Sequence, residues 1–180
     1  MPDFPIIGQP HASPTVICSV SSPESLGVEL GAFSQGLSAT ALVALNVYYI
    51  PFRLAAPMVA RQMFIENGGT ISGSFDVGIY SQDGSRLVNS PSGSVAHAGG
   101  NVLQIVDITD TLLLPGRYYM ALVFDNGSAL VMRGSFSPTA AVVGIFNQTL
   151  GALPLPATAT FAEPTLGTIP VLGITSKVTI

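Results

Sequence analysis

Short runs of apolar and β-branched residues recur about every ten residues from position 41 onward, and turn-forming residues separate them. Clear runs are NVYYIPF, MVARQMFIE, SFDVGIY and RYYMALVF, with ENGG, QDG, PG and DNG among the separators. No segment shows the periodicity of an amphipathic helix. The pattern predicts an all-β fold, most simply a two-sheet antiparallel β-sandwich of jelly-roll type.

The two ends of the chain predict different structures. Residues 1–40 mix Pro, Ser and Gly with scattered apolar residues, and TVICSV is their clearest strand-like run. We expect residues 1–40 to form an extended N-terminal arm and irregular edge, and residues 41–180 to form the sandwich domain. The final VLGITSKVTI alternates, which predicts a strand to the last residue with four side chains on one side: Leu172, Ile174, Val178 and Ile180.

Alternation also assigns faces within individual strands. In SFDVGIY, Phe75, Val77 and Ile79 face opposite to Asp76, Gly78 and Tyr80, which predicts a half-buried strand. The following QDG predicts a tight turn into SRLV. In MVARQMFIE, we expect one face to carry Val59, Met63 and Ile65, with Arg61 among them.

Other segments predict central strands and turns. RYYMALVF is apolar on both faces, which predicts a central position in its sheet. NGG at 67–69 predicts a turn with positive φ, and DNG at 125–127 predicts a hairpin turn. AVVGIFNQ and TATFAE are predicted strands, separated by the Pro-rich LGALPLPA.

The low charge of the chain bounds its function. Only 9% of residues are charged, against about 25% in ordinary soluble proteins, so the surface is largely uncharged and suits burial against other protein. The net charge is −4, and the cations are dispersed along the sequence, which disfavours nucleic-acid binding. They are Arg53, Arg61, Arg86, Arg117, Arg133 and Lys177.

Membrane and export signals are not evident. No apolar run approaches the ~20 residues of a membrane span. The start, MPDFPIIGQPHASPT, lacks the basic segment and long apolar run of a secretory signal. We therefore expect synthesis in the cytoplasm and no membrane partner.

Two segments together support a family resemblance. GSFDVGIYSQDGSRLV at 73–88 and VDITDTLLLPGRYYMALVF at 106–124 resemble a pattern of tailed-bacteriophage virion proteins. In those proteins a "vGIYd-x-dG" strand pairs with a later "L-x-pGxYYlal" strand, in small capsid-decorating, fibre or tail-associated sandwiches. The resemblance covers roughly residues 46–135.

This resemblance implies a non-enzymatic structural component of a virion, most simply a capsid decoration or cement protein. It also implies contacts with other virion proteins, above all the major capsid protein, and with copies of itself as a homotrimer. A receptor- or carbohydrate-binding module of a head or tail fibre is the alternative. No binding residue is carried over, because the matching strands contain no shared functional motif.

Candidate groups for chemistry are few. His11 and His97 lie in Pro/Ser/Gly-rich surroundings without metal-binding spacing, and we expect loop histidines without partners. Asp107, Asp110 and Asp125 could offer oxygen ligands to calcium, but we expect them to cap turns, because no EF-hand-like run is present. We predict no metal and no cofactor.

Catalytic and sugar-binding patterns are equally weak. The sequence contains no GxSxG motif and no distinctive carboxylate pair, so we predict no catalytic residues and no enzyme activity. The single Cys18 predicts a buried free thiol. Five tyrosines could form a sugar-stacking surface, although four occur as YY pairs in which one ring would face the core: Tyr48, Tyr49, Tyr80, Tyr118 and Tyr119.

Overall fold

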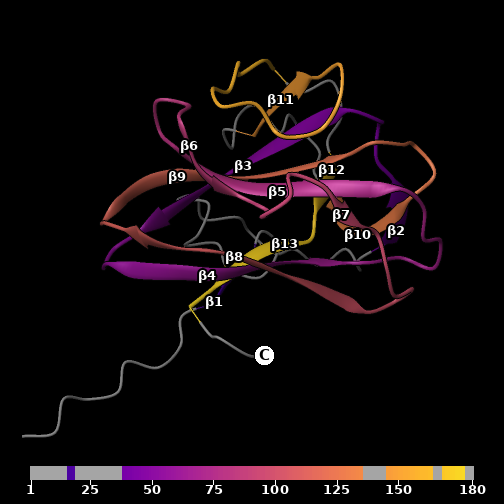
Figure 1. The fold of residues 1–180 in the computed structure, drawn as a ribbon, viewed down its shortest axis with the longest axis horizontal. Helices are drawn as coiled ribbons and strands as arrows, with labels where there is room; N and C mark the ends of the chain where they lie inside the picture. The colour runs from indigo at the N-terminus through magenta and orange to yellow at the C-terminus, as the bar shows by residue number, and fades with distance from the viewer. Residues whose placement is uncertain (1–15, 19–37, 136–144, 164–167, 177–180) are drawn as a thin grey trace, which may run out of the picture.

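The computed structural model describes residues 16–18, 38–135, 145–163 and 168–176, and within these ranges the chain forms β-strands and no helix (Figure 1). The strands are β1 (Val16–Cys18), β2 (Ser38–Ala41), β3 (Asn46–Leu54), β4 (Met58–Glu66), β5 (Ser74–Ser81), β6 (Arg86–Asn89), β7 (Val95–Ala96), β8 (Leu103–Leu113), β9 (Gly116–Phe124), β10 (Leu130–Ser135), β11 (Phe146–Thr149), β12 (Thr168–Pro170) and β13 (Leu172–Thr175). The predicted all-β fold is confirmed. A search of the described residues for helices able to cross a membrane finds none.

The strands form three antiparallel sheets. The large sheet has the order β11-β3-β9-β5-β6, and β7 also pairs with β5. The four-stranded sheet has the order β1-β13-β4-β8, and the small sheet the order β12-β10-β2. Figure 1 shows the large sheet lying above the four-stranded sheet, with β10 and β2 at the right of the view.

The main core lies between the large and the four-stranded sheets. Alternate residues of facing strands point inward, as the pleat of a strand requires. Its members include Ile50 and Phe52 of β3, Val77 and Ile79 of β5, Met63 and Ile65 of β4, Met120 and Leu122 of β9, and Leu172 and Ile174 of β13. The expected inward faces of β5 and β13 are therefore confirmed for the described residues, while Val178 and Ile180 lie outside them.

β9 occupies the centre of the large sheet. It lies between β3 and β5, and its register with β5 runs from Phe124 opposite Phe75 to Tyr118 opposite Ser81. Side chains on one face of β9 belong to the main core, and side chains on its other face belong to a second core. This explains why RYYMALVF is apolar on both faces, and its predicted central position is confirmed.

A second core covers the outer face of the large sheet. The buried residues Tyr49, Tyr80 and Val123 pack there against the covering segment, which we define as residues 150–161. The Tyr49 and Tyr80 rings meet edge to face with centroids 5.2 Å apart. The predicted half-burial of β5 is therefore wrong, because this later segment removes the second face from water.

A break in strand pairing changes the expected faces of β4. Ala60 lies opposite Thr111, but Gln62 lies opposite Asp107, so the single residue Arg61 faces three residues of β8. This β-bulge reverses the alternation. Met58 rather than Val59 shares the core with Met63, and the prediction for Val59 is wrong.

Three predicted turns have different outcomes. The turn at Asp83 and Gly84 is confirmed, with φ of +89° at Gly84. Gly68 does not have positive φ; it is needed because an added Cβ would lie 2.7 Å from Leu130 Cβ. DNG does not form a hairpin, because β9 pairs with β3 and β5 while β10 joins the small sheet.

The ends of the described chain contribute strands. β1, within TVICSV, pairs with β13, and β2 spans the expected boundary between residues 40 and 41. The remainder of the predicted N-terminal arm lies outside the described residues, and so does the side chain of Cys18. In TATFAE, Thr158 and Ala162 form isolated bridges rather than a strand.

Candidate functional site

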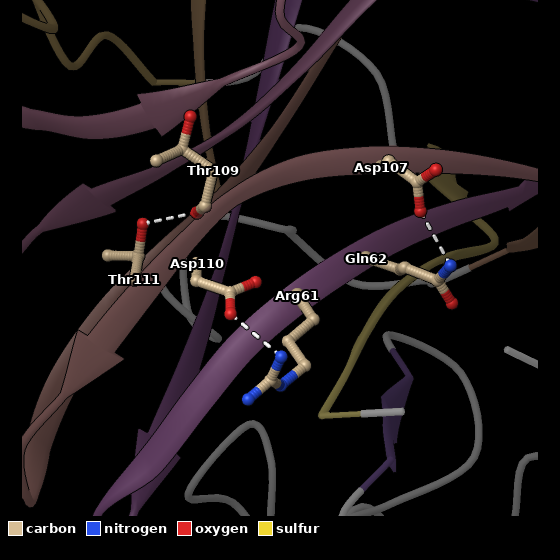
Figure 2. A network of polar contacts seen from close by, with 6 residues as sticks. All are labelled: Arg61, Gln62, Asp107, Thr109, Asp110 and Thr111. Atoms are coloured by element: carbon tan, nitrogen blue, oxygen red, sulfur yellow. Dashed lines mark hydrogen bonds and ion pairs between the residues drawn. The ribbon is translucent and has the colours of Figure 1, made fainter. Parts of the chain in front are cut away.

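The β-bulge of β4 and β8 gathers a polar network on the outer face of the four-stranded sheet (Figure 2). Arg61 Nη1 lies 2.7 Å from Asp110 Oδ2. Gln62 Nε2 donates a hydrogen bond of 2.6 Å to Asp107 Oδ1. Because the bulge reverses the alternation at Arg61, these two consecutive side chains line the same hollow, of about 240 Å³.

The chemistry available to this network is limited. Each carboxylate already accepts a bond from a side chain of β4, so neither caps a turn as expected. Asp125 lies outside this network, directly after β9, and accepts a 3.0 Å hydrogen bond from the backbone amide of Ser74. Within the described ranges, no three or more His, Cys, Asp or Glu side chains gather in a group that could hold a metal ion.

His97 lies in the loop after β7, as expected, but it is buried and has partners, so the expectation of a histidine without partners is wrong. Its ring makes edge-to-face contacts with Phe75 and Phe124, and its Nδ1 accepts a hydrogen bond from the amide of Ser72 at 3.3 Å. Burial lowers the pKa of His97 below its ordinary value. His11 lies outside the described residues.

The five tyrosines do not form one surface. Tyr48, Tyr49 and Tyr80 are buried, so both rings of the first YY pair are removed from water, one in each core. Tyr118 and Tyr119 are half-buried, and they point to opposite faces of β9. A sugar-stacking platform made by all five rings is therefore absent.

A pair of arginines forms the second candidate site. Arg53 at the end of β3 lies directly opposite Arg117 at the start of β9. Both are exposed, and both line a hollow of about 600 Å³ together with Gln82. The sequence analysis missed this pair, because the two arginines come together only through the register of two strands far apart in the chain.

Comparison of the chain with protein-family models, with curated proteins and with solved structures finds no match.

Proposed function

We propose that this chain is a non-enzymatic structural component of a tailed-bacteriophage virion, with a jelly-roll sandwich as its fold. Its role would be that of a capsid decoration or cement protein, which stabilises the particle through subunit contacts. The resemblance of residues 73–88 and 106–124 supports the virion assignment, and the exposed face of β8 supports the assembly role.

β8 is the observation that carries this proposal. It is an 11-residue strand at the edge of the four-stranded sheet, and among the described strands it pairs only with β4. Its sequence, LQIVDITDTLL, contains neither lysine nor proline, two residues that commonly protect sheet edges from pairing with other chains.

Three of the six exposed side chains of β8 are large and apolar. Leu103 and Ile105 are exposed near its start, and Leu112 near its end is 62% exposed. The Arg61–Asp110 ion pair lies between these two apolar ends. An apolar surface with a fixed polar centre suits a protein partner, because apolar burial gives affinity and the charges give register.

The partners would be other virion proteins, above all the major capsid protein, and copies of the chain in a homotrimer. Few charges oppose such contacts, since only 9% of the chain is charged. Sedimentation equilibrium tests the self-association. A mass of three chains of 18.6 kDa is expected, whereas a monomer at high concentration would contradict the homotrimer.

Attachment to particles tests the main proposal. Purified wild-type chain is added to particles assembled without it, and the variants Ile105→Lys and Leu112→Lys are compared by co-sedimentation. We expect wild-type chain to bind and to raise the heat resistance of the particles, and both variants to lose binding. Circular dichroism establishes that each variant keeps its fold.

Leu87→Lys is the matched control. Leu87 is 43% exposed, like Ile105 at 38%, but it lies on β6 of the large sheet. The Leu87→Lys variant should bind to the particles at wild-type occupancy. Full binding by Ile105→Lys and Leu112→Lys would refute the β8 contact. If particles assembled without the chain keep their heat resistance but lose adsorption to host cells, the receptor-binding alternative is favoured.

A further inference from the structure

The cross-strand pair Arg53–Arg117 places two like charges side by side. Residues directly opposite in an antiparallel pair have Cβ atoms about 4.5–5.5 Å apart, and like charges in such a pair destabilise the sheet. Neither guanidinium forms a salt bridge with any residue in the described part of the chain. Within the described residues, the pair therefore holds a concentrated positive charge that no acidic side chain neutralises.

Among the described residues that line the hollow, Gln82 offers a further hydrogen-bond donor and none carries a carboxylate. Because Ser81 lies opposite Tyr118, the next residue, Gln82, follows on the side of Arg117 and lines the same hollow. The walls come from the β3–β4 turn at Ala55 and the β8–β9 turn at Pro115. The chain has ten acidic residues and six Lys or Arg, yet two of those six cations meet here, and none of the described residues that line the hollow is acidic.

The pair lies on the outer face of the large sheet. Arg53 lies on the same face of β3 as Tyr49, which belongs to the second core. Arg117 lies on the same face of β9 as Tyr119, which packs against that core. No residue of the covering segment lines the hollow. The hollow therefore opens beside the second core, where a ligand can reach the arginines from solvent.

We propose that this hollow binds an oxyanion, a carboxylate or a phosphate group, between the guanidinium groups of Arg53 and Arg117. The planar fork of a guanidinium matches both groups through two parallel N–H···O bonds, and the Gln82 amide supplies a further donor. The bound anion neutralises the repulsion between the two arginines. This site is independent of the β8 contact and does not rest on the proposed function.

Thermal unfolding of the full chain tests the site. An anion that binds only the folded state raises the melting temperature. At matched ionic strength, replacing chloride by phosphate at a concentration tenfold above its dissociation constant should raise it by about 3–6 °C. Arg53→Gln and Arg117→Gln should lose this increment, and in chloride they should melt no lower than wild type, because each removes the repulsion.

Arg61→Gln is the matched control, since it removes the same charge from a residue already paired with Asp110. It should retain the full response to phosphate. Phosphate also stabilises proteins without a specific site, so the comparison among variants is decisive. Equal phosphate increments in wild type, Arg53→Gln and Arg117→Gln would overturn the proposal.

A second arm distinguishes the source of the anion. The blocked peptide acetyl-Glu-Gly-Glu-amide is compared with its Gln counterpart, and NMR follows the arginine side-chain N–H resonances. Arginine-dependent binding of phosphate alone indicates a free anion, whereas binding of the Glu peptide alone indicates a carboxylate of another protein. Binding of neither probe would overturn the site.

Discussion

The carboxylate of Asp76 accepts a hydrogen bond from the backbone amide of Leu155, with 2.9 Å between Oδ2 and N, and thereby joins β5 to the covering segment. Asp76 is fully buried, and its carboxylate also accepts hydrogen bonds from the Ser90 hydroxyl at 2.6 Å and from the side-chain Nδ2 of Asn89 at 3.0 Å. One side chain on the outer face of β5 therefore orders two segments that follow it in the chain.

Replacing Asp76 by Ala should loosen the covering segment. The amide of Leu155 and the hydroxyl of Ser90 would lose their acceptor while buried, and each unsatisfied donor costs about 1–3 kcal/mol. We expect the free energy of unfolding to fall by about 3 kcal/mol in urea titrations. Protease cleavage within residues 150–161 should accelerate.

Asp83→Ala is the control for this change. Asp83 is exposed at the β5–β6 turn, where it accepts hydrogen bonds from Ser81 and Ser85. Its loss should cost below about 1 kcal/mol. Equal destabilisation by the two variants would show that Asp76 does not anchor the covering segment.

Gly78→Ala should destabilise the fold through crowding. Its added Cβ would lie 2.8 Å from the carbonyl oxygen of Val88 and 3.0 Å from Leu155 Cδ1, and overpacking of this kind typically costs about 1–3 kcal/mol. Gly151→Ala has no atom within 4 Å of the new Cβ and should leave the melting temperature within about 1 °C. Calorimetry of the two variants measures the difference, and similar melting temperatures would contradict the close packing of Leu155 on β5.

The burial of His97 predicts a loss of stability in mild acid. Its folded-state pKa lies below the ordinary value of 6.5, so the unfolded chain takes up the proton first as the pH falls. The His97 contribution is fully present above about pH 6.5 and declines below it until the folded-state pKa is passed. His97→Phe should flatten this part of the stability profile in urea titrations at pH 5–8, and an unchanged slope in the variant would assign the effect to another group.

Two phenols should resist ionisation in alkali. Burial raises the pKa of Tyr49 to about 12 and that of Tyr80 further, and their hydroxyls donate to Gln148 Oε1 and the Pro156 carbonyl. Because unfolded tyrosines ionise near pH 10, stability is complete below pH 10 and is lost as the pH rises above it. Absorbance at 295 nm should show two phenols that ionise only at higher pH.

The same titration in guanidinium chloride should show all five tyrosines ionising together near pH 10. Tyr49→Phe and Tyr80→Phe should each remove one of the late-ionising groups. Ionisation of all five near pH 10 in a chain that remains folded by circular dichroism would contradict the burial of these rings.

Local patterns predicted what local forces determine. RYYMALVF is apolar on both faces, so its central position could be predicted without knowing its neighbours, and the turn at Gly84 follows from the backbone freedom of glycine. Leu172 and Ile174 reach the core because a strand alternates.

The same reasoning failed where contacts join residues that lie far apart in the sequence. The outer face of β5 contains Asp76 and Tyr80, which suggest solvent exposure, but the covering segment lies more than 70 positions later in the chain. The irregular pairing at Arg61 reversed the expected face of Val59, since the alternation of β4 changes between Ala60 and Met63. The Arg53–Arg117 pair depends on strand register, which no single run of residues contains.

The position of β13 between β1 and β4 also bears on protein synthesis. β4 ends at Glu66, whereas β13, which pairs with it, starts at Leu172. The edge of β4 that pairs with β13 therefore stays unpaired while the ribosome makes the intervening chain. Pairings so distant in sequence form slowly, and unpaired edges in nascent chains promote aggregation. The core between the large and the four-stranded sheets therefore closes only after translation has passed residue 175, and slower synthesis lengthens the time for which this edge of β4 is exposed to aggregation.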